Sequence, residues 1–204
     1  MTAQHILLIL NPVSGKMKSR SGLFDILDEL YHLPDGTPAS DRRVTVCTTL
    51  YRGHATELAS AAVAEGYDRV LCCGGDGTLN EVVNGLMQAE NRPTLGYIPA
   101  GTTNDFATSL CIPKKMDKAA IAAVSGVPVW VDVGRFGQEY FAYVAAFGAF
   151  TDVAYTTPQD MKNSLGRLAY VLACAQRLTS LPSYHIRLEH DEGAVPVAHG
   201  DVRE

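Results

Sequence analysis

The chain has 204 residues, 47% of them hydrophobic, and a mean hydropathy of +0.02, which is typical of a globular protein with one or two small domains. The net charge of −5 argues against a general nucleic-acid-binding protein. No apolar run approaches the roughly 18 residues that span a bilayer. The first residues also lack the pattern of a signal peptide, so we expect a cytoplasmic protein.

Residues 5–10 form a continuous apolar run, which predicts a strand buried on both faces of a parallel sheet. The run ends in a short loop, residues 11–15, that offers an amide, a hydroxyl and a flexible glycine. Met17 follows Lys16 where a Walker A loop has Ser or Thr, so the loop is not of that type. On local grounds a polar turn is the simpler interpretation, although ligands of α/β sheets bind at such strand ends. Residues 23–30 predict a helix.

The next predicted elements are a strand over residues 43–50 and an alanine-rich helix over 53–66. Residues 69–73 then form a short apolar strand that runs into a cluster of glycines. Thr78 is the predicted N-cap of the helix that follows, because apolar side chains recur at helical spacing over residues 82–87.

The glycine cluster between this strand and helix is the most informative stretch. Glycines at positions 74, 75 and 77 would let a phosphate approach the backbone and the positive end of the helix dipole. Asp76 would repel that phosphate unless a divalent cation lies between them or the carboxylate orients an attacking hydroxyl. Taken alone, the run is equally well explained as a flexible strand-to-helix turn.

Residues 94–99 predict a fourth strand, and residues 100–107 repeat the order of glycine, hydroxyls and an acid at a helix start. A further helix is predicted over residues 116–125. The alternation of strands and helices with short connections predicts a doubly wound α/β sheet.

The pattern changes near residue 126, where we place a domain boundary. A hairpin is predicted from residues 129–134 and 140–145 with a turn at 136–138, and a second from 185–189 and 195–198. One helix, at about 162–180, lies between them. The prediction is thus an α/β domain over 1–126 and a partial β-rich domain over 127–204. The five cysteines, most of them in apolar runs, are expected to be buried small hydrophobes.

Several motifs in this order resemble the catalytic domain of the diacylglycerol kinase family, soluble bacterial lipid kinases related to sphingosine kinases. The matching residues are 11–15, 74–81, 99–107, 131–134 and 165–170. The resemblance implies a Rossmann-like nucleotide-binding domain followed by the beginning of a sandwich-like second domain.

The resemblance also implies a site. An acidic network of Asp76, Asp105 and Asp132 would be catalytic, and Asp76 would approach Mg²⁺ through Mg-ATP. The substrate would be diacylglycerol or a related lipid alcohol at the inner face of the membrane, converted to phosphatidic acid. The residues expected to line the ATP site are Asn11, Pro12, Val13, Ser14, Gly15, Thr49, Gly75, Asp76, Gly77, Thr78, Leu79, Asn80, Glu81 and Thr102.

The chain departs from the family in its length. Family members continue into a complete second domain with a structural magnesium site and a late Asp-Gly-Glu motif that supplies the proposed general base, so we expect that the C-terminal part is lacking. A general base contributes on the order of 10² to 10⁴ in rate, and turnover could be impaired without it. The alternatives are a nucleotide-binding fragment without turnover and an NAD kinase-like phosphotransferase. Unpaired strand edges in an unfinished sheet would favour a homo-oligomer.

Overall fold

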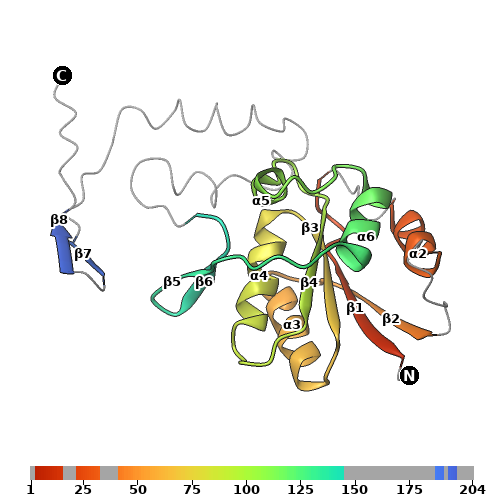
Figure 1. Cartoon of the computed structure of the whole chain (residues 1–204), viewed down its shortest axis with the longest axis horizontal. Coiled ribbons are helices and arrows are strands. Elements are labelled where there is room, and N and C mark those ends of the chain that lie inside the picture. Colours follow the sequence, from red (N-terminus) through yellow and green to blue (C-terminus); the bar gives the residue numbers. More distant parts are fainter. Residues whose placement is uncertain (1–2, 16–21, 33–40, 145–186, 191–192, 197–204) are drawn as a thin grey trace. The chain divides into compact units, whose positions relative to one another are not determined.

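The computed structural model describes residues 3–15, 22–32, 41–144, 187–190 and 193–196. Four parallel strands form one sheet in the order β2-β1-β3-β4 (Figure 1). In register, Leu8 of β1 lies beside Val46 of β2 and Leu71 of β3. The bounds of the strands are β1 Gln4–Leu10, β2 Arg42–Thr48, β3 Arg69–Gly74 and β4 Thr94–Pro99.

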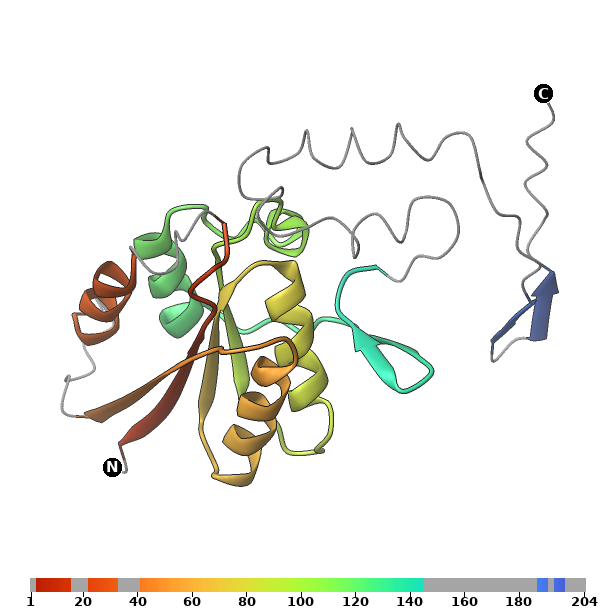
Figure 2. The same cartoon turned by 180° about the vertical axis from the view of Figure 1, so that it is seen from behind.

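Helices cover both faces of this sheet, as the two opposite views show (Figures 1 and 2). Helices α2 (Leu23–Tyr31) and α6 (Met116–Ser125) pack on one face, and α3 (His54–Ala64) and α4 (Asp76–Leu86) pack on the other. The short helix α5 (Asp105–Ser109) follows β4. The predicted doubly wound α/β fold is confirmed, and α6 and β4 have the bounds that the sequence predicts.

Burial on both faces of the sheet explains the apolar run of β1, residues 6–10. Ile6 and Leu8 pack into the core beneath α2 and α6, whereas Leu7 and Ile9 pack beneath α3 and α4. All four side chains are buried. Burying each such side chain contributes about 1.5–3 kcal/mol, so β1 anchors both layers at once.

The strand order creates a switch point between β1 and β3. The chain leaves β1 towards α2 on one face, and it leaves β3 towards α4 on the other face. Because the connections diverge, a crevice is expected outside the carboxyl ends of these two strands, where α/β proteins bind ligands.

A small hairpin follows the sheet, with β5 (Gly134–Phe136) paired to β6 (Glu139–Phe141) through a turn that contains Gly137 at φ +63°. The buried Asn84 of α4 holds it, because its side chain exchanges two 2.8 Å hydrogen bonds with the backbone of Tyr140. The hairpin predicted from residues 129–134 and 140–145 with a turn at 136–138 is confirmed in position, but its strands are shorter than predicted, since pairing begins only at Gly134 and β6 ends at Phe141. The preceding stretch is exposed, Trp130 fully so, and has no strand partner among the described residues.

A second two-stranded hairpin, β7 (Arg187–His190) with β8 (Gly193–Pro196), confirms the one predicted near the C-terminal end, with bounds shifted by one to two residues. The helix expected at about 162–180 lies outside the described residues. The chain divides into two compact units, Met1–Ala145 and Ala146–Glu204. The division into domains 1–126 and 127–204 stays a prediction.

The cysteines follow the prediction only in part. Cys72 and Cys73 are buried in β3 and Cys47 is half-buried, but Cys111 is exposed because it follows α5 in a surface turn. Cys174 lies outside the described residues. No helix in the described part of the chain is both long and apolar enough to cross a membrane.

Candidate functional site at the carboxyl edge of the sheet

The loops that follow the strands are tied together by backbone hydrogen bonds at the carboxyl edge of the sheet. The N–H of Asn11, after β1, donates to Cys73 O at 2.9 Å, and the N–H of Ala100, after β4, donates to Gly74 O at 2.7 Å. The N–H of Thr49, after β2, donates to Leu10 O at 2.9 Å. The three predicted phosphate-facing segments therefore begin side by side.

Asn11 links the first loop to helix α4. Its side-chain amide donates to Thr78 Oγ1 at 2.8 Å, and its Oδ1 accepts from the N–H of Val13 at 3.1 Å. The predicted N-cap role of Thr78 is wrong, because α4 begins at Asp76 with Gly75 as its N-cap. Thr78 is instead buried against Gly74, where a Cβ would come within 2.6 Å of the Thr78 Cβ.

Glycines allow these loops to touch backbone to backbone. A Cβ on Gly15, which has φ +50°, would overlap the carbonyl oxygen of Ala100. A Cβ on Gly101 would come within 2.5 Å of the Cα of Gly75. Any side chain at Gly15 or Gly101 would thus push the loops apart.

The first turn of α4 has the features that a phosphate group requires. Gly77 is exposed, and a Cβ built on it meets nothing within 4 Å, so space lies open beside the helix start. The first N–H groups of a helix have no partner inside that helix, and the helix dipole favours an anion there. The residues present therefore fit a bound phosphate.

Asp76 has a role that its position in the sequence did not reveal. Its two carboxylate oxygens accept hydrogen bonds from the N–H groups of Asp105 at 3.2 Å and Phe106 at 3.3 Å. The carboxylate therefore joins the start of α4 to the start of α5. A carboxylate has about four lone-pair sites, so two such bonds leave room for a further hydrogen bond or a cation. Oxygen ligands of this kind suit Mg²⁺.

The other two aspartates of the predicted network are placed differently. The side chains of Asp105 and Asp132 are exposed, and Asp132 lies in the irregular segment before β5. Within the described residues, no group of three or more His, Cys, Asp or Glu side chains is arranged to hold a metal ion. The acidic network stays a prediction.

The other residues predicted to line the ATP site differ in how far their side chains are exposed. The side chain of Leu79 is 2% exposed and packs in the core, so only its backbone could serve a ligand. Thr102 is exposed, Val13 is 54% exposed, and Ser14 is buried. The other four are half-buried, namely Pro12, Thr49, Asn80 and Glu81. Their roles as ATP-site residues stay predictions.

Sequence reasoning assigned no role to two side chains that organise this edge, Tyr97 and Asn104, although Asn104 lies in the matching segment 99–107. Tyr97 of β4 lies with its hydroxyl 3.3 Å from both Gly74 O and Asn104 Oδ1. The Asn104 side chain also exchanges two 2.9 Å hydrogen bonds with the backbone of Gly101. An aromatic residue inside an apolar strand looks like core in a sequence, which is why Tyr97 gave no signal.

An aromatic pair lies next to Thr49, at the start of α3. Tyr51 and His54 stack with ring centroids 4.7 Å apart, and His54 Nδ1 accepts from the N–H of Leu50 at 3.1 Å. The hydroxyl of Tyr51 donates to the Glu57 carboxylate at 2.7 Å, and this hydrogen bond raises the pKa of Tyr51.

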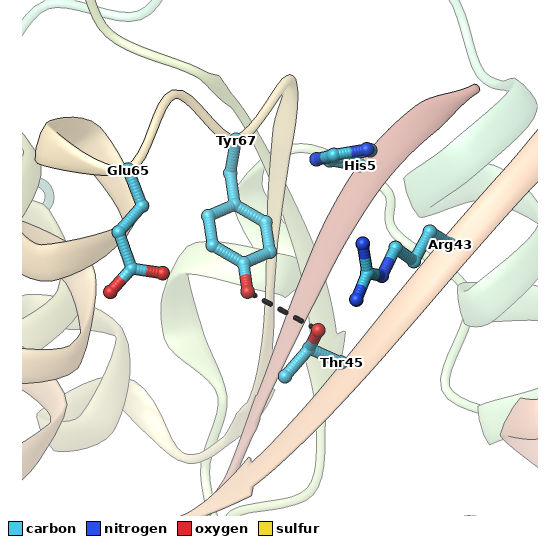
Figure 3. Close-up of a pocket in the computed structure, with 5 residues that line it drawn as sticks. All are labelled: His5, Arg43, Thr45, Glu65 and Tyr67. Carbon is cyan, nitrogen blue, oxygen red and sulfur yellow. Dashed lines mark hydrogen bonds between the residues drawn. The ribbon is translucent and has the colours of Figure 1, made fainter. Parts of the chain in front are cut away.

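The opposite, amino edge of the sheet carries a polar hollow of about 210 Å³ (Figure 3). In it, the hydroxyl of Tyr67 donates to Thr45 Oγ1 at 3.2 Å. The hollow is lined by His5, Arg43, Thr45, Glu65 and Tyr67. It holds none of the predicted site residues, and its rim offers both a cation and a carboxylate. We base the candidate site on the carboxyl edge, where helix starts and glycine-rich loops meet.

Comparison with known proteins shows the family to which the chain belongs. Residues 5–136 match the model of the diacylglycerol kinase catalytic domain. A diacylglycerol kinase of Bacillus subtilis (strain 168) is 39% identical over 185 residues, which cover 90% of this chain and 59% of that protein. A diacylglycerol kinase of Staphylococcus saprophyticus is 37% identical over 185 residues, covering 91% of this chain and 58% of that protein.

Solved structures give the same picture of the fold. The crystal structure of a diacylglycerol kinase from Bacillus anthracis str. Sterne superposes with a TM-score of 0.69 at 27% sequence identity, covering 97% of this chain and 62% of that chain. The chain thus spans about three fifths of the length of these relatives, 58% to 62%.

Proposed function

Because the chain belongs to the diacylglycerol kinase catalytic-domain family, we propose that it is an ATP-dependent lipid kinase. It transfers the γ-phosphoryl group of ATP to the hydroxyl of diacylglycerol or a related lipid alcohol, giving phosphatidic acid. The observation that carries the proposal is the meeting of three loops at the switch point, where Gly75 contacts Gly101 and Asn11 binds Thr78.

The carboxyl edge offers groups that could position and neutralise the phosphates during phosphoryl transfer. Such transfer depends on positioning the phosphates and neutralising their charge far more than on covalent chemistry. The N–H groups at the start of α4 would hold phosphate oxygens beside Gly77, where space lies open. The loop at Asn11 and the loop at Thr102 would flank them.

Asp76 would be the ligand for Mg²⁺, which neutralises phosphate charge when bound. Its carboxylate is already oriented by the N–H groups of Asp105 and Phe106, so its position does not depend on a cation. Asp105 and Asp132 would complete an acidic surround for the acceptor hydroxyl. The lipid would come from the inner face of the membrane, with the protein cytoplasmic and peripheral.

The test is phosphorylation of diacylglycerol in mixed micelles with labelled ATP and MgCl₂, comparing the 204-residue chain with Asp76→Asn. Asparagine keeps an oxygen that can accept from the N–H groups of α5 but removes the charge. We expect the rate of phosphatidic acid formation to fall by on the order of 100-fold.

Asp68→Asn is the matched control. Asp68 likewise accepts a backbone N–H, from His5 at 2.7 Å, but at the amino edge. The variant Asp68→Asn should leave the rate of phosphatidic acid formation unchanged. Absence of phosphorylated lipid with the parent chain, or an equal rate with Asp76→Asn, would contradict the proposal. ATP binding without lipid product would reduce the chain to a nucleotide-binding unit.

A further inference from the structure

Tyr97 is a tyrosine whose ring lies in the core and whose hydroxyl lies at the candidate site. The residue is 5% exposed, and its ring centroid is 6.1 Å from that of Phe106. Its hydroxyl lies 3.3 Å from Gly74 O, at the end of β3, and 3.3 Å from Asn104 Oδ1. One hydroxyl proton is thus shared between two acceptors, one at the end of β3 and one in the loop after β4.

Asn104 transmits this contact to the loop after β4. It is the N-cap of α5 and has left-handed backbone angles, φ 55° and ψ 54°, which asparagine tolerates better than most residues. Its Oδ1 accepts from the N–H of Gly101 and its Nδ2 donates to Gly101 O, both at 2.9 Å. The side chain therefore fixes both backbone groups of Gly101.

Gly101 in turn lies against Gly75, the N-cap of α4. A Cβ on Gly75 would come within 3.1 Å of the Cα of Gly101, which shows how closely the two backbones approach. The hydroxyl of Tyr97 therefore binds the residue before Gly75 on one side and the residue that holds Gly101 on the other. Tyr97 thus links the two loops through a side chain on the core side of the contact, in addition to the link that the Asp76 carboxylate makes to α5.

We propose that Tyr97 is a positioning residue that sets the spacing between the loops at Gly75 and Gly101 and thereby the affinity for the phosphates of ATP. The proposal rests on the proposed function. It assigns no direct contact between Tyr97 and a ligand, since the hydroxyl acts through Gly74 and Asn104.

The chemistry of the side chain suits this task. Burial raises the pKa of Tyr97 above its ordinary value of 10, so the hydroxyl stays neutral and able to donate at physiological pH. Phenylalanine keeps the ring and its packing against Phe106 but removes the shared proton. Tyr97→Phe therefore separates the loop contact from the contribution of the ring to the core.

The first test is equilibrium binding of ATP with MgCl₂ to the 204-residue chain, measured by calorimetry. We expect Tyr97→Phe to weaken ATP binding about fivefold, which is the typical size of the effect of losing one hydrogen bond. The matched control is Tyr67→Phe, which removes a tyrosine hydroxyl bonded to Thr45 at the amino edge. The control should bind ATP as the parent does.

The second test reads the loop directly and needs no ATP. Hydrogen exchange at the amides of residues 101–104 should become faster in Tyr97→Phe, and exchange in α3 should not change. Asn104→Gly keeps the left-handed backbone and removes the amide. In that background Tyr97→Phe should have no further effect on ATP affinity, because residues that act through one another are non-additive.

The outcomes separate the two proposals. Unchanged ATP affinity and unchanged exchange in Tyr97→Phe would overturn the role of Tyr97, as would an equal loss of affinity in Tyr67→Phe. Faster exchange with unchanged affinity would overturn the link to the nucleotide and leave only a structural contact. A parent chain that binds no ATP would overturn the proposed function and, with it, any role of Tyr97 in nucleotide binding.

Discussion

The two edges of the four-stranded sheet differ in the atoms that line them, which are backbone atoms at the carboxyl edge and side-chain atoms at the amino edge. At the carboxyl edge, loops meet backbone to backbone through Gly15, Gly75 and Gly101, so that added side chains would collide with main-chain atoms. At the amino edge, the polar hollow is made of side chains such as Arg43 and Tyr67, which extend from β2 and from the segment after α3 (Figure 3).

The amino edge therefore offers a hollow lined by side chains, and the carboxyl edge offers the backbone groups on which the proposed phosphate site depends. Backbone N–H groups and a helix start provide fixed partial charges, whereas long side chains at a rim must be ordered before they bind. A cavity by itself therefore says little about where the chemistry lies. The comparison predicts that the carboxyl edge tolerates change poorly and that the amino edge tolerates it well.

The largest expected effect is that of Gly15→Ala. The added methyl group would overlap Ala100 O, and φ +50° is strained for alanine. Together these should lower the free energy of unfolding by about 3 kcal/mol. Gly66→Ala, at φ +72° with nothing within 4 Å of the added methyl group, is the matched control and should cost about 1 kcal/mol. Urea unfolding measures both, and equal losses would show that the carboxyl edge has no special tightness.

A smaller effect should appear when the pH is varied, because β3 contains two buried thiols, those of Cys72 and Cys73. Burial raises the pKa of Cys73 from 9.0 to about 12, and burial also raises the pKa of Cys72. Above pH 9 the unfolded chain loses these protons while the folded chain keeps them, so stability falls as pH rises. Between pH 8 and pH 10 we expect each of the two thiols to lower the free energy of unfolding by about 1–2 kcal/mol.

The substitution Cys73→Ala should reduce that slope, as urea unfolding at the two pH values would reveal. Cys111→Ala replaces an exposed thiol and should leave the slope as it is. A slope that is the same in Cys73→Ala and in the parent would mean that burial of this thiol does not couple folding to pH.

The smallest expected effect lies at the amino end of β3, at Arg69. Its Nη1 donates to Ala123 O at 2.8 Å, while its buried Nε has no hydrogen-bond partner among the described residues. Burial lowers the pKa of this guanidinium. Arg69→Met keeps the apolar stem and removes the whole guanidinium group, so the free energy of unfolding should change by only about 0.5 kcal/mol. A loss above about 2 kcal/mol in thermal or urea unfolding would show that this edge is as constrained as the other.

Much of the sheet could be predicted from the sequence because its signals are local. The strand Thr94–Pro99 and the helix Met116–Ser125 have the predicted bounds, since apolar periodicity and flanking turn residues fix them. The hairpin β5–β6 has the predicted turn but shorter strands than predicted, because its contact with the rest of the fold is made at Tyr140 by Asn84 of α4, 56 residues away in the chain.

The candidate site shows the same division between local and long-range information. The motif around Asp76 marks the loop, but its hydrogen bonds to Asp105 and Phe106 span 29 and 30 residues and leave no local trace. Thr78 has the residue type of an N-cap, yet Gly74 leaves space for its side chain to turn inwards. Tyr97 stands in an apolar run that predicts only a buried core position. The contact of its hydroxyl with Asn104 appears only in the folded structure.

The most direct test of the account is the footprint of ATP on the 204-residue chain, measured by amide hydrogen exchange with MgCl₂ present. The account predicts slower exchange in residues 11–15, 75–81 and 101–104, with no change around the hollow at His5, Arg43 and Tyr67. Protection at that hollow instead, or no protection anywhere, would contradict the claim that the carboxyl edge is the nucleotide site.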